Sequence, residues 1–98
     1  MDNKTNELLN QQINFEFYSA YLYLAMSTYF SEINMDGFAK FMKNQAKEEL
    51  EHAQKIYDYL LLRDKKITYQ KIDAPDTDWV NAQDVLEDAI EHEKMIST

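Results

Sequence analysis

Helix-breaking residues are almost absent from this chain, which contains one glycine and one proline among 98 residues. Gly37 and Pro75 leave long stretches free of such residues, and Leu, Ala, Glu, Lys and Met, which favour helices, are abundant. The sequence therefore predicts an all-α fold. Its length suits one small domain with a single core.

Two long stretches have apolar residues at helical spacing, and we expect one helix over about 6–32 and a second over about 36–63. The connection between them is short, so these helices are expected to be antiparallel neighbours. Past Phe15 the first helix is apolar nearly all round, which requires burial on two sides. We expect one side to face its own bundle and the other to face a second subunit.

The expected helix caps follow from the polar residues at the helix ends. Asn3 or Thr5 is a candidate cap for the first helix, and Asp36 can cap the second. Asn81 and Asp84 form a pair that resembles a capping box at the start of a third helix.

No sustained helical period runs from about 64 to 80, and Pro75 marks a turn there. About 17 residues is long for a loop in a compact domain. We therefore expect a crossover along the length of a bundle, with Trp79 as an anchor, and a third helix from about 82. That helix is still open at Thr98, so residues 1–98 are expected to form a single domain that is incomplete at its C-terminus.

Charge and composition exclude several classes of partner. The net charge of −8 disfavours binding to nucleic acid and to anionic membranes. No apolar run approaches the roughly 18 residues that a membrane span requires. The N-terminus lacks the features of a signal peptide, and there is no Cys for disulfides or thiolate metal sites. We expect a soluble, cytoplasmic protein.

Three inward carboxylates and one histidine are the candidate site. Glu49 and His52 lie three residues apart on the apolar face of the second helix, and Glu16 and Glu93 lie at inward positions of the first and third. Buried carboxylates that converge from three helices require a common cation. A Glu-x-x-His unit that faces into a bundle is the ligand unit of di-iron carboxylate proteins. Oxygen and imidazole ligands suit iron or manganese, and zinc remains open.

Three further residues each have more than one interpretation. Tyr23 lies on the same face as Glu16, where it is a core aromatic, a hydrogen-bond donor to a ligand, or a one-electron donor. Glu48 lies about 100° off the main stripe, which favours a solvated position over a peripheral cation site. His92, at the edge of its stripe, is interpreted as a surface or interface residue.

Segments along the whole chain resemble bacterial non-haem ferritins. The segment Asn14–Tyr23 resembles their first helix, Asp36-Gly37 followed by Glu48–Ala53 resembles the second, and Glu91–Glu93 resembles the third. Ala74-Pro75 lies in what would be the long crossover. The resemblance implies a ferritin-like antiparallel four-helix bundle, of which this chain supplies two full helices and the start of a third.

The resemblance also implies a ferroxidase centre. Glu16, Glu49 and His52 would hold one iron, and Glu49 would bridge to a second iron held by Glu93. The implied function is iron storage and detoxification, in which Fe(II) is oxidised by dioxygen or peroxide and stored as ferric mineral. The storage compartment would be a homo-oligomeric cage, of 24 subunits by resemblance.

Other residues are assigned by the same resemblance. Tyr23 matches the tyrosine beside the ferroxidase centre, and Glu48 matches a contributor to a third iron site. Haem is not expected, because a haem-binding bacterioferritin carries Met where this chain has Leu50.

The chain departs from the ferritin pattern at its C-terminal side. Ferritins supply a further Glu, and a nearby Gln or Glu, from a fourth helix that this sequence lacks. Either residues 1–98 are a fragment, which the open third helix favours, or two chains complete one bundle. The implied enzyme activity therefore belongs to the complete protein.

Two alternative functions stay open. One is a rubrerythrin-like di-metal carboxylate oxidoreductase, which the lack of Cys disfavours because those proteins usually add a Cys cluster. The other is a non-enzymatic helical oligomerisation subunit whose inward Glu residues pair with basic residues of a partner. The lack of inward Lys on the stripes disfavours it.

Overall fold

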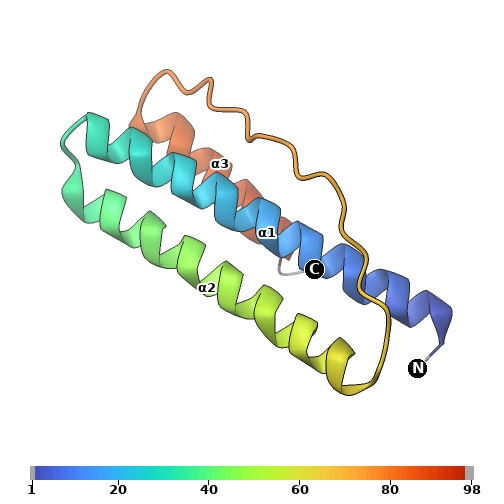
Figure 1. Ribbon diagram of the computed structural model, residues 1–98. Coiled ribbons are helices and arrows are strands. Elements are labelled where there is room, and N and C mark those ends of the chain that lie inside the picture. The colour runs from blue at the N-terminus through green and yellow to red at the C-terminus, as the bar shows by residue number, and fades with distance from the viewer. Residues whose placement is uncertain (1, 97–98) are drawn as a thin grey trace.

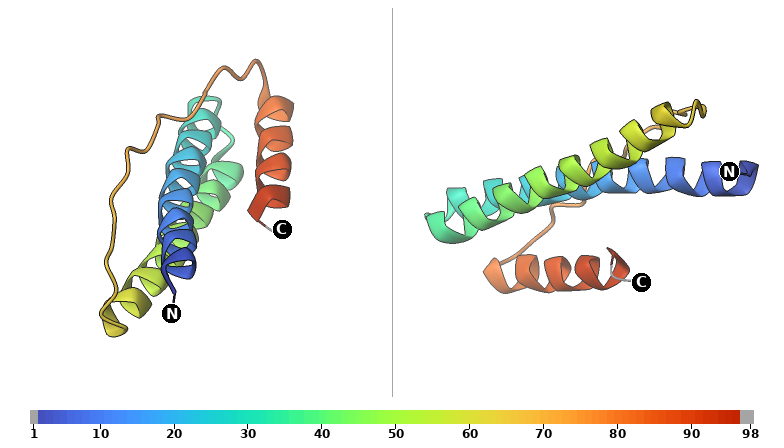
Figure 2. Two further views of the ribbon diagram at one scale, coloured as in Figure 1. Left: turned by 90° about the vertical axis from the view of Figure 1, so that its right-hand side faces the viewer. Right: turned by 90° about the horizontal axis from the view of Figure 1, so that it is seen from below.

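The computed structural model describes residues 2–96, which form three α-helices and no strand: α1 (Asn3–Glu32), α2 (Asp36–Leu62) and α3 (Ala82–Ile96). α1 and α2 are an antiparallel pair, and α3 runs antiparallel to α1 (Figure 1). The views of Figure 2 show α3 standing apart from α2. The prediction of an all-α fold is confirmed. Within the described residues no helix is long and apolar enough to cross a bilayer.

The first two helices are not capped as expected. α1 begins at Asn3 because the carboxylate of Asp2 accepts a 2.7 Å hydrogen bond from the N–H of Thr5. The prediction of Asn3 or Thr5 as the cap was therefore wrong, since an upstream aspartate caps equally well. The prediction for Asp36 was also wrong. The N-cap is Met35, which makes no side-chain cap bond, and Asp36 lies in the first turn, where its charge complements the helix dipole.

Both long helices end without glycine. Asn34 (φ 62°) and Asp64 (φ 56°) adopt the left-handed conformation just after α1 and α2. The residue that follows each donates its N–H to the carbonyl five residues back, at 2.8 and 2.9 Å respectively. This Schellman geometry closes the helix ends, and it turns the chain directly from α1 into α2.

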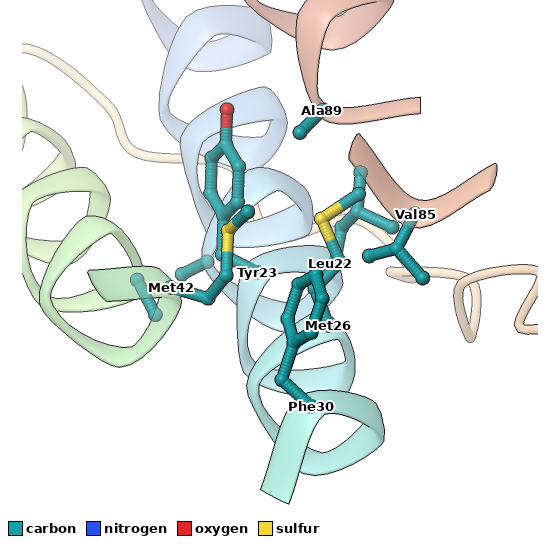
Figure 3. Close-up of a cluster of buried hydrophobic side chains, with 9 residues drawn as sticks. Leu22, Tyr23, Met26, Phe30, Met42, Val85 and Ala89 are labelled. Atoms are coloured by element: carbon teal, nitrogen blue, oxygen red, sulfur yellow. The ribbon is translucent and has the colours of Figure 1, made fainter. Parts of the chain in front are cut away.

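The hydrophobic core is divided into two clusters. The large cluster draws on all three helices and consists of Ala20, Leu22, Tyr23, Met26, Phe30, Met42, Ala46, Val85 and Ala89. In Figure 3 the hydroxyl of Tyr23 points away from Met26 and Phe30. The small cluster consists of Ile13, Ala53 and Leu60, and it joins α1 to α2 alone. The candidate site lies between the two clusters.

The crossover between α2 and α3 runs along the outside of the bundle (Figure 1) and is held at both ends. The buried side chain of Asn10 donates to a backbone carbonyl of the crossover at 3.1 Å and accepts from the N–H of Thr68 at 2.8 Å. At the other end, the indole of Trp79 donates to Asp88 at 2.6 Å and packs edge-on to Tyr29. The expectation that Trp79 is an anchor is confirmed.

Candidate metal centre

Glu16 on α1 and Glu49 on α2 occupy the gap between the large and small clusters. Along each helix, the small cluster lies on one side of the glutamate and the large cluster on the other. Each glutamate is only 3% exposed. Two carboxylates therefore lie inside the apolar interface of a helix pair, where burial without a compensating partner is costly.

The structure brings Glu16, Glu49 and His52 together as one group, and we call these three residues the trio. One ligand atom from each lies within 4.8 Å of the others. Nδ1 of His52 is 3.3 Å from Oε2 of Glu16 and 3.8 Å from Oε2 of Glu49. The imidazole nitrogen and two carboxylate oxygens thus converge on one small volume.

Electrostatic repulsion within the trio is not relieved by the residues around it. Oε2 of Glu49 is buried and has no hydrogen-bond partner among the described residues. The pKa of Glu49 is raised to about 8, mainly by burial. A hydrogen bond between protonated Glu49 and Glu16, and the negative charges of Glu16, Glu93 and Glu48, raise it further. A divalent cation between these oxygens would remove the repulsion. The orphaned oxygen therefore fits a metal-ion site.

Glu16 is oriented by two side chains. Its Oε1 accepts a 2.7 Å hydrogen bond from Nε2 of Gln12, one helical turn earlier, and its Oε2 faces the ring of His52. Sequence analysis missed Gln12. The signal was its i, i+4 spacing to Glu16, which places both residues on one side of α1.

His52 differs from its expected environment. It was predicted on the apolar face, whereas its side chain is 52% exposed. Three residues rotate a helix by about 300°, so His52 lies some 60° from Glu49, at the margin of the buried stripe. Its exposed side gives solvent and ions a route to the trio.

Tyr23 and Glu93 form a second polar contact beside the trio. The buried hydroxyl of Tyr23 donates to Oε1 of Glu93. Burial, followed by this hydrogen bond and the nearby carboxylates, raises the pKa of Tyr23 well above its usual range. The phenol therefore stays protonated. It can act as a hydrogen-bond donor to Glu93.

The inward position expected for Glu93 is only partly correct. Its Oε1 reaches Tyr23, but the residue as a whole is exposed, and it does not belong to the trio. The reason is its place at the edge of an open groove of about 640 Å³ that Met42 and Ala89 also line. Glu48 is exposed, and its role at a third iron site stays a prediction.

His92 is not a surface residue, so the surface part of its interpretation as a surface or interface residue was wrong. It is 6% exposed, and its Nε2 lies 2.7 Å from the hydroxyl of Ser19. Its ring stacks on Phe15 and meets the ring of Tyr23 edge-on. Aromatic side chains on α1 cover this position of α3, so it is buried although it lies at the edge of the apolar stripe. Burial lowers the pKa of His92.

The donor set defines what this centre can do chemically. Two carboxylates and one imidazole, without thiolates, suit divalent iron or manganese and also accept zinc. The trio offers three ligands and an open flank at His52, so a bound ion would keep positions for water or an oxidant. Such an arrangement is compatible with chemistry at the metal.

Comparisons with known proteins identify a matching family. The family model of the ferritin-like domain matches residues 6–98. Over 94 residues, the chain is 39% identical to a bacterial non-heme ferritin from Bacteroides fragilis (strain 638R), covering 96% of this chain and 59% of that protein. The chain thus spans about three fifths of the length of this relative.

Solved structures give the same result. A humanized archaeal ferritin superposes with a TM-score of 0.93 at 43% identity, over 98% of this chain and 59% of that chain. A variant of the protein PmFTN, whose crystal was soaked in iron, superposes with a TM-score of 0.91 at 29% identity. That superposition covers 96% of this chain and 60% of the variant.

Proposed function

Because this chain belongs to the ferritin family, we propose that the protein stores and detoxifies iron and that the trio binds Fe(II) for oxidation. The observation that carries this proposal is the orphaned oxygen of Glu49. It is buried, it faces a second buried carboxylate and an imidazole, and it has no hydrogen-bond partner and no Lys or Arg beside it among the described residues. A divalent cation is the simplest group that satisfies all three side chains.

The trio binds the first Fe(II), and Gln12 keeps Glu16 oriented toward it. Imidazole and carboxylate ligands hold Fe(II) and, after oxidation, stabilise the higher charge of Fe(III). Each Fe(II) gives up one electron. Dioxygen or peroxide takes up the electrons from two ions together with two protons. The substrate and oxidant reach the site over the exposed side of His52.

Glu93 completes the second iron position, with Glu49 as the bridge. The carboxylate of Glu93 already accepts from Tyr23, which fixes one of its oxygens near the trio. Charge supports this assignment, since Glu93 and Glu16 both contribute to raising the pKa of Glu49. Both carboxylates are therefore close enough to Glu49 to influence its charge, which is the proximity that a bridging ligand requires.

The alternative of a purely structural subunit gains no support from the ion pairs. Among the described residues, the only ion pairs of Glu16 and Glu49 are with His52, and no Lys or Arg neutralises them. Without such cations, a helical spacer would leave Glu49 compensated only by a bound proton, which its pKa of about 8 allows at neutral pH but which brings no structural gain. Iron binding accounts for the same carboxylates without them.

A second copy of the chain covers the apolar groove between α1 and α2 in our proposal. This groove has a volume of about 640 Å³, and we call it the pair groove. It is lined by Phe17, Ala20, Tyr21, Leu24, Lys43, Asn44, Ala46, Lys47, Leu50 and Ile72. Tyr21, Leu24 and Leu50 are 47%, 49% and 42% exposed. Such a contiguous apolar surface supports a homo-oligomer, for which a 24-subunit cage is the arrangement we propose.

The groove beside Glu93 receives a fourth helix in the same proposal. Phe41, Ile90 and Leu86 line it together with Tyr23, so an apolar helix face fits there. This helix would complete the four-helix bundle and add ligands to the second iron position. The intact mass tests its origin: a mass above 11.7 kDa indicates that the same chain supplies it, and a mass of 11.7 kDa indicates a second copy.

The ferroxidase proposal is tested by aerobic addition of Fe(II) to the purified protein. The absorbance of the ferric product in the near ultraviolet is followed against buffer. We expect faster oxidation than in buffer, a strong loss in Glu49→Ala, and a smaller loss in Glu93→Ala. The matched control is Glu51→Ala, an exposed glutamate on the same helix. A rate equal to buffer, or one unchanged in Glu49→Ala, contradicts the proposal.

The oligomer is tested by sedimentation velocity. Leu24→Lys places a charge in the pair groove, and we expect it to shift the protein to smaller species. Leu62→Lys is the control, since Leu62 is 82% exposed and lies outside that groove. Identical sedimentation of the Leu24→Lys variant and the unmodified protein would rule out the pair groove as a subunit interface.

A further inference from the structure

His92 is buried beside the site, yet the proposed chemistry assigns it no task. It lies on α3 directly before Glu93. Four residues of α1 contact it: the hydroxyl of Ser19 lies against its Nε2, and the rings of Phe15, Tyr18 and Tyr23 pack around it. Ser19 is 0% exposed and His92 is 6% exposed. A fully buried polar pair of this kind is expected to have a defined role.

The second hydrogen bond of Ser19 favours one direction for its contact with His92. The hydroxyl of Ser19 has one proton, which it donates to the carbonyl of Phe15 at 2.9 Å. Its oxygen therefore accepts from Nε2–H of His92 at 2.7 Å. The imidazole is a donor in this contact and does not act as a base toward Ser19. In this tautomer the pair cannot act as a Ser–His nucleophile, and we assign it a positional role.

Two hydrogen bonds connect α1 to α3 at adjacent residues of α3. Ser19 contacts His92, and Tyr23, one turn further along α1, donates to Glu93. Adjacent helical residues point about 100° apart, so these two bonds together fix both the rotation and the axial position of α3. Apolar packing alone would hold α3 less firmly than these hydrogen bonds and the packing do together, since α3 contributes only Val85 and Ala89 to the buried residues of the large cluster.

We propose that His92 is a positioning residue that, through its hydrogen bond to Ser19 and its stacking on Phe15, holds α3 in the rotation that directs Glu93 to the metal centre. The inference rests on the proposed function, because Glu93 matters only if the centre binds iron. Glu93 is otherwise exposed, so its direction depends on how α3 is held. Tyr23 fixes one of its oxygens, and His92 fixes the backbone from which it extends.

The test compares three substitutions by their rates of Fe(II) oxidation. His92→Leu removes the N–H donor and the ring. Ser19→Ala removes the acceptor oxygen and introduces a residue that favours helices. We expect each to lower the rate on the order of 10-fold to 100-fold, as is typical when a partner that orients a ligand is lost. His92→Gln keeps an N–H donor close to the place of Nε2 and should restore most of the rate. Circular dichroism checks that every variant is helical.

A double-variant comparison separates a positioning role from a general loss of stability. In the Glu93→Ala background, His92→Leu should cause little further loss, because the residue it positions is gone. A comparable loss in both backgrounds, or no loss in either, overturns the inference. If the unmodified protein itself oxidises Fe(II) no faster than buffer, the proposed function fails and the inference fails with it.

A second readout is independent of iron. The chain has only two histidines, so the ring nitrogens of the metal-free protein are resolvable by ¹⁵N NMR. We expect His92 to be in the Nε2–H tautomer alone in the unmodified protein. In the Ser19→Ala variant we expect a mixture of the two tautomers. A predominant Nδ1–H tautomer at His92 in the unmodified protein would contradict the hydrogen bond on which the inference depends.

Discussion

Replacing Glu49 with Gln should stabilise the metal-free protein at alkaline pH. The amide has nearly the shape of the carboxyl group but cannot ionise. In the folded protein, burial and the neighbouring carboxylates raise the pKa of Glu49 from 4.5 to about 8. Between these two pH values the folded state holds a proton that the unfolded state has lost. The free energy of unfolding therefore falls as the pH rises through this range.

The size of the effect follows from the shift and from the exposure of the site. Each pKa unit corresponds to about 1.36 kcal/mol, which sets an upper limit of roughly 4 to 5 kcal/mol. Water reaches the cluster at His52, whose side chain is 52% exposed, and this screens part of the repulsion. We therefore expect the Glu49→Gln variant to be about 1–2 kcal/mol more stable than the unmodified protein at pH 8.5.

Urea unfolding, followed by circular dichroism, measures this difference after chelation of metals. The experiment is run at pH 5 and pH 8.5 with one protein concentration. At pH 5 the two proteins should differ little, because Glu49 is protonated in the fold. Glu51→Gln, the same change at an exposed site, should show no such pH-dependent gain. The reasoning about repulsion in the trio would be refuted if Glu49→Gln did not raise the free energy of unfolding at pH 8.5, or if it raised it equally at pH 5.

Three further substitutions and one control, all measured by urea unfolding, test the core, the crossover and the end of α2. Met26 is 0% exposed, and Met26→Ala should lower the free energy of unfolding by about 2–5 kcal/mol. The control Leu62→Ala, at a side chain that is 82% exposed, should lower it much less. Equal losses in the two variants would contradict the assigned core. Asn10→Ala removes two hydrogen bonds to the crossover and should cost about 1–3 kcal/mol, and an unchanged stability would mean that the crossover is not held there. Asp64 has a left-handed backbone conformation, which Gly adopts without strain. Asp64→Gly should therefore leave the free energy of unfolding unchanged or raise it by up to about 1 kcal/mol. A clear loss would contradict that conformation.

The helices and the trio were predictable because both depend on local periodicity. The apolar residues at helical spacing predicted helices over about 6–32 and 36–63, and the structure has helices over Asn3–Glu32 and Asp36–Leu62. Glu16 and Glu49 were recognisable because each interrupts an apolar stripe, and both are buried. A charged residue at such a position stands out in the sequence without any knowledge of tertiary contacts.

The environments of His52, His92 and Glu93 depend on neighbours, and periodicity alone could not give them. The sequence pattern placed His52 on its apolar stripe and His92 at the edge of its own, but the opposing helix decides which of these side chains is buried. Phe15 and Tyr18 on α1 cover His92, whereas no described residue covers the outer side of His52. Glu93 has the spacing of an inward residue but borders an open groove, so it is exposed. The assignment of Glu93 and Glu48 as metal ligands stays a prediction.

An anomalous-difference map of crystals soaked anaerobically in Fe(II) tests the central claim most directly. We predict a strong iron peak between the carboxylates of Glu16 and Glu49 and Nδ1 of His52. The same peak should be absent from crystals of Glu49→Ala treated in the same way. Iron found only on the exposed acidic surface, with none at the trio, would contradict the claim that these three residues form the iron site.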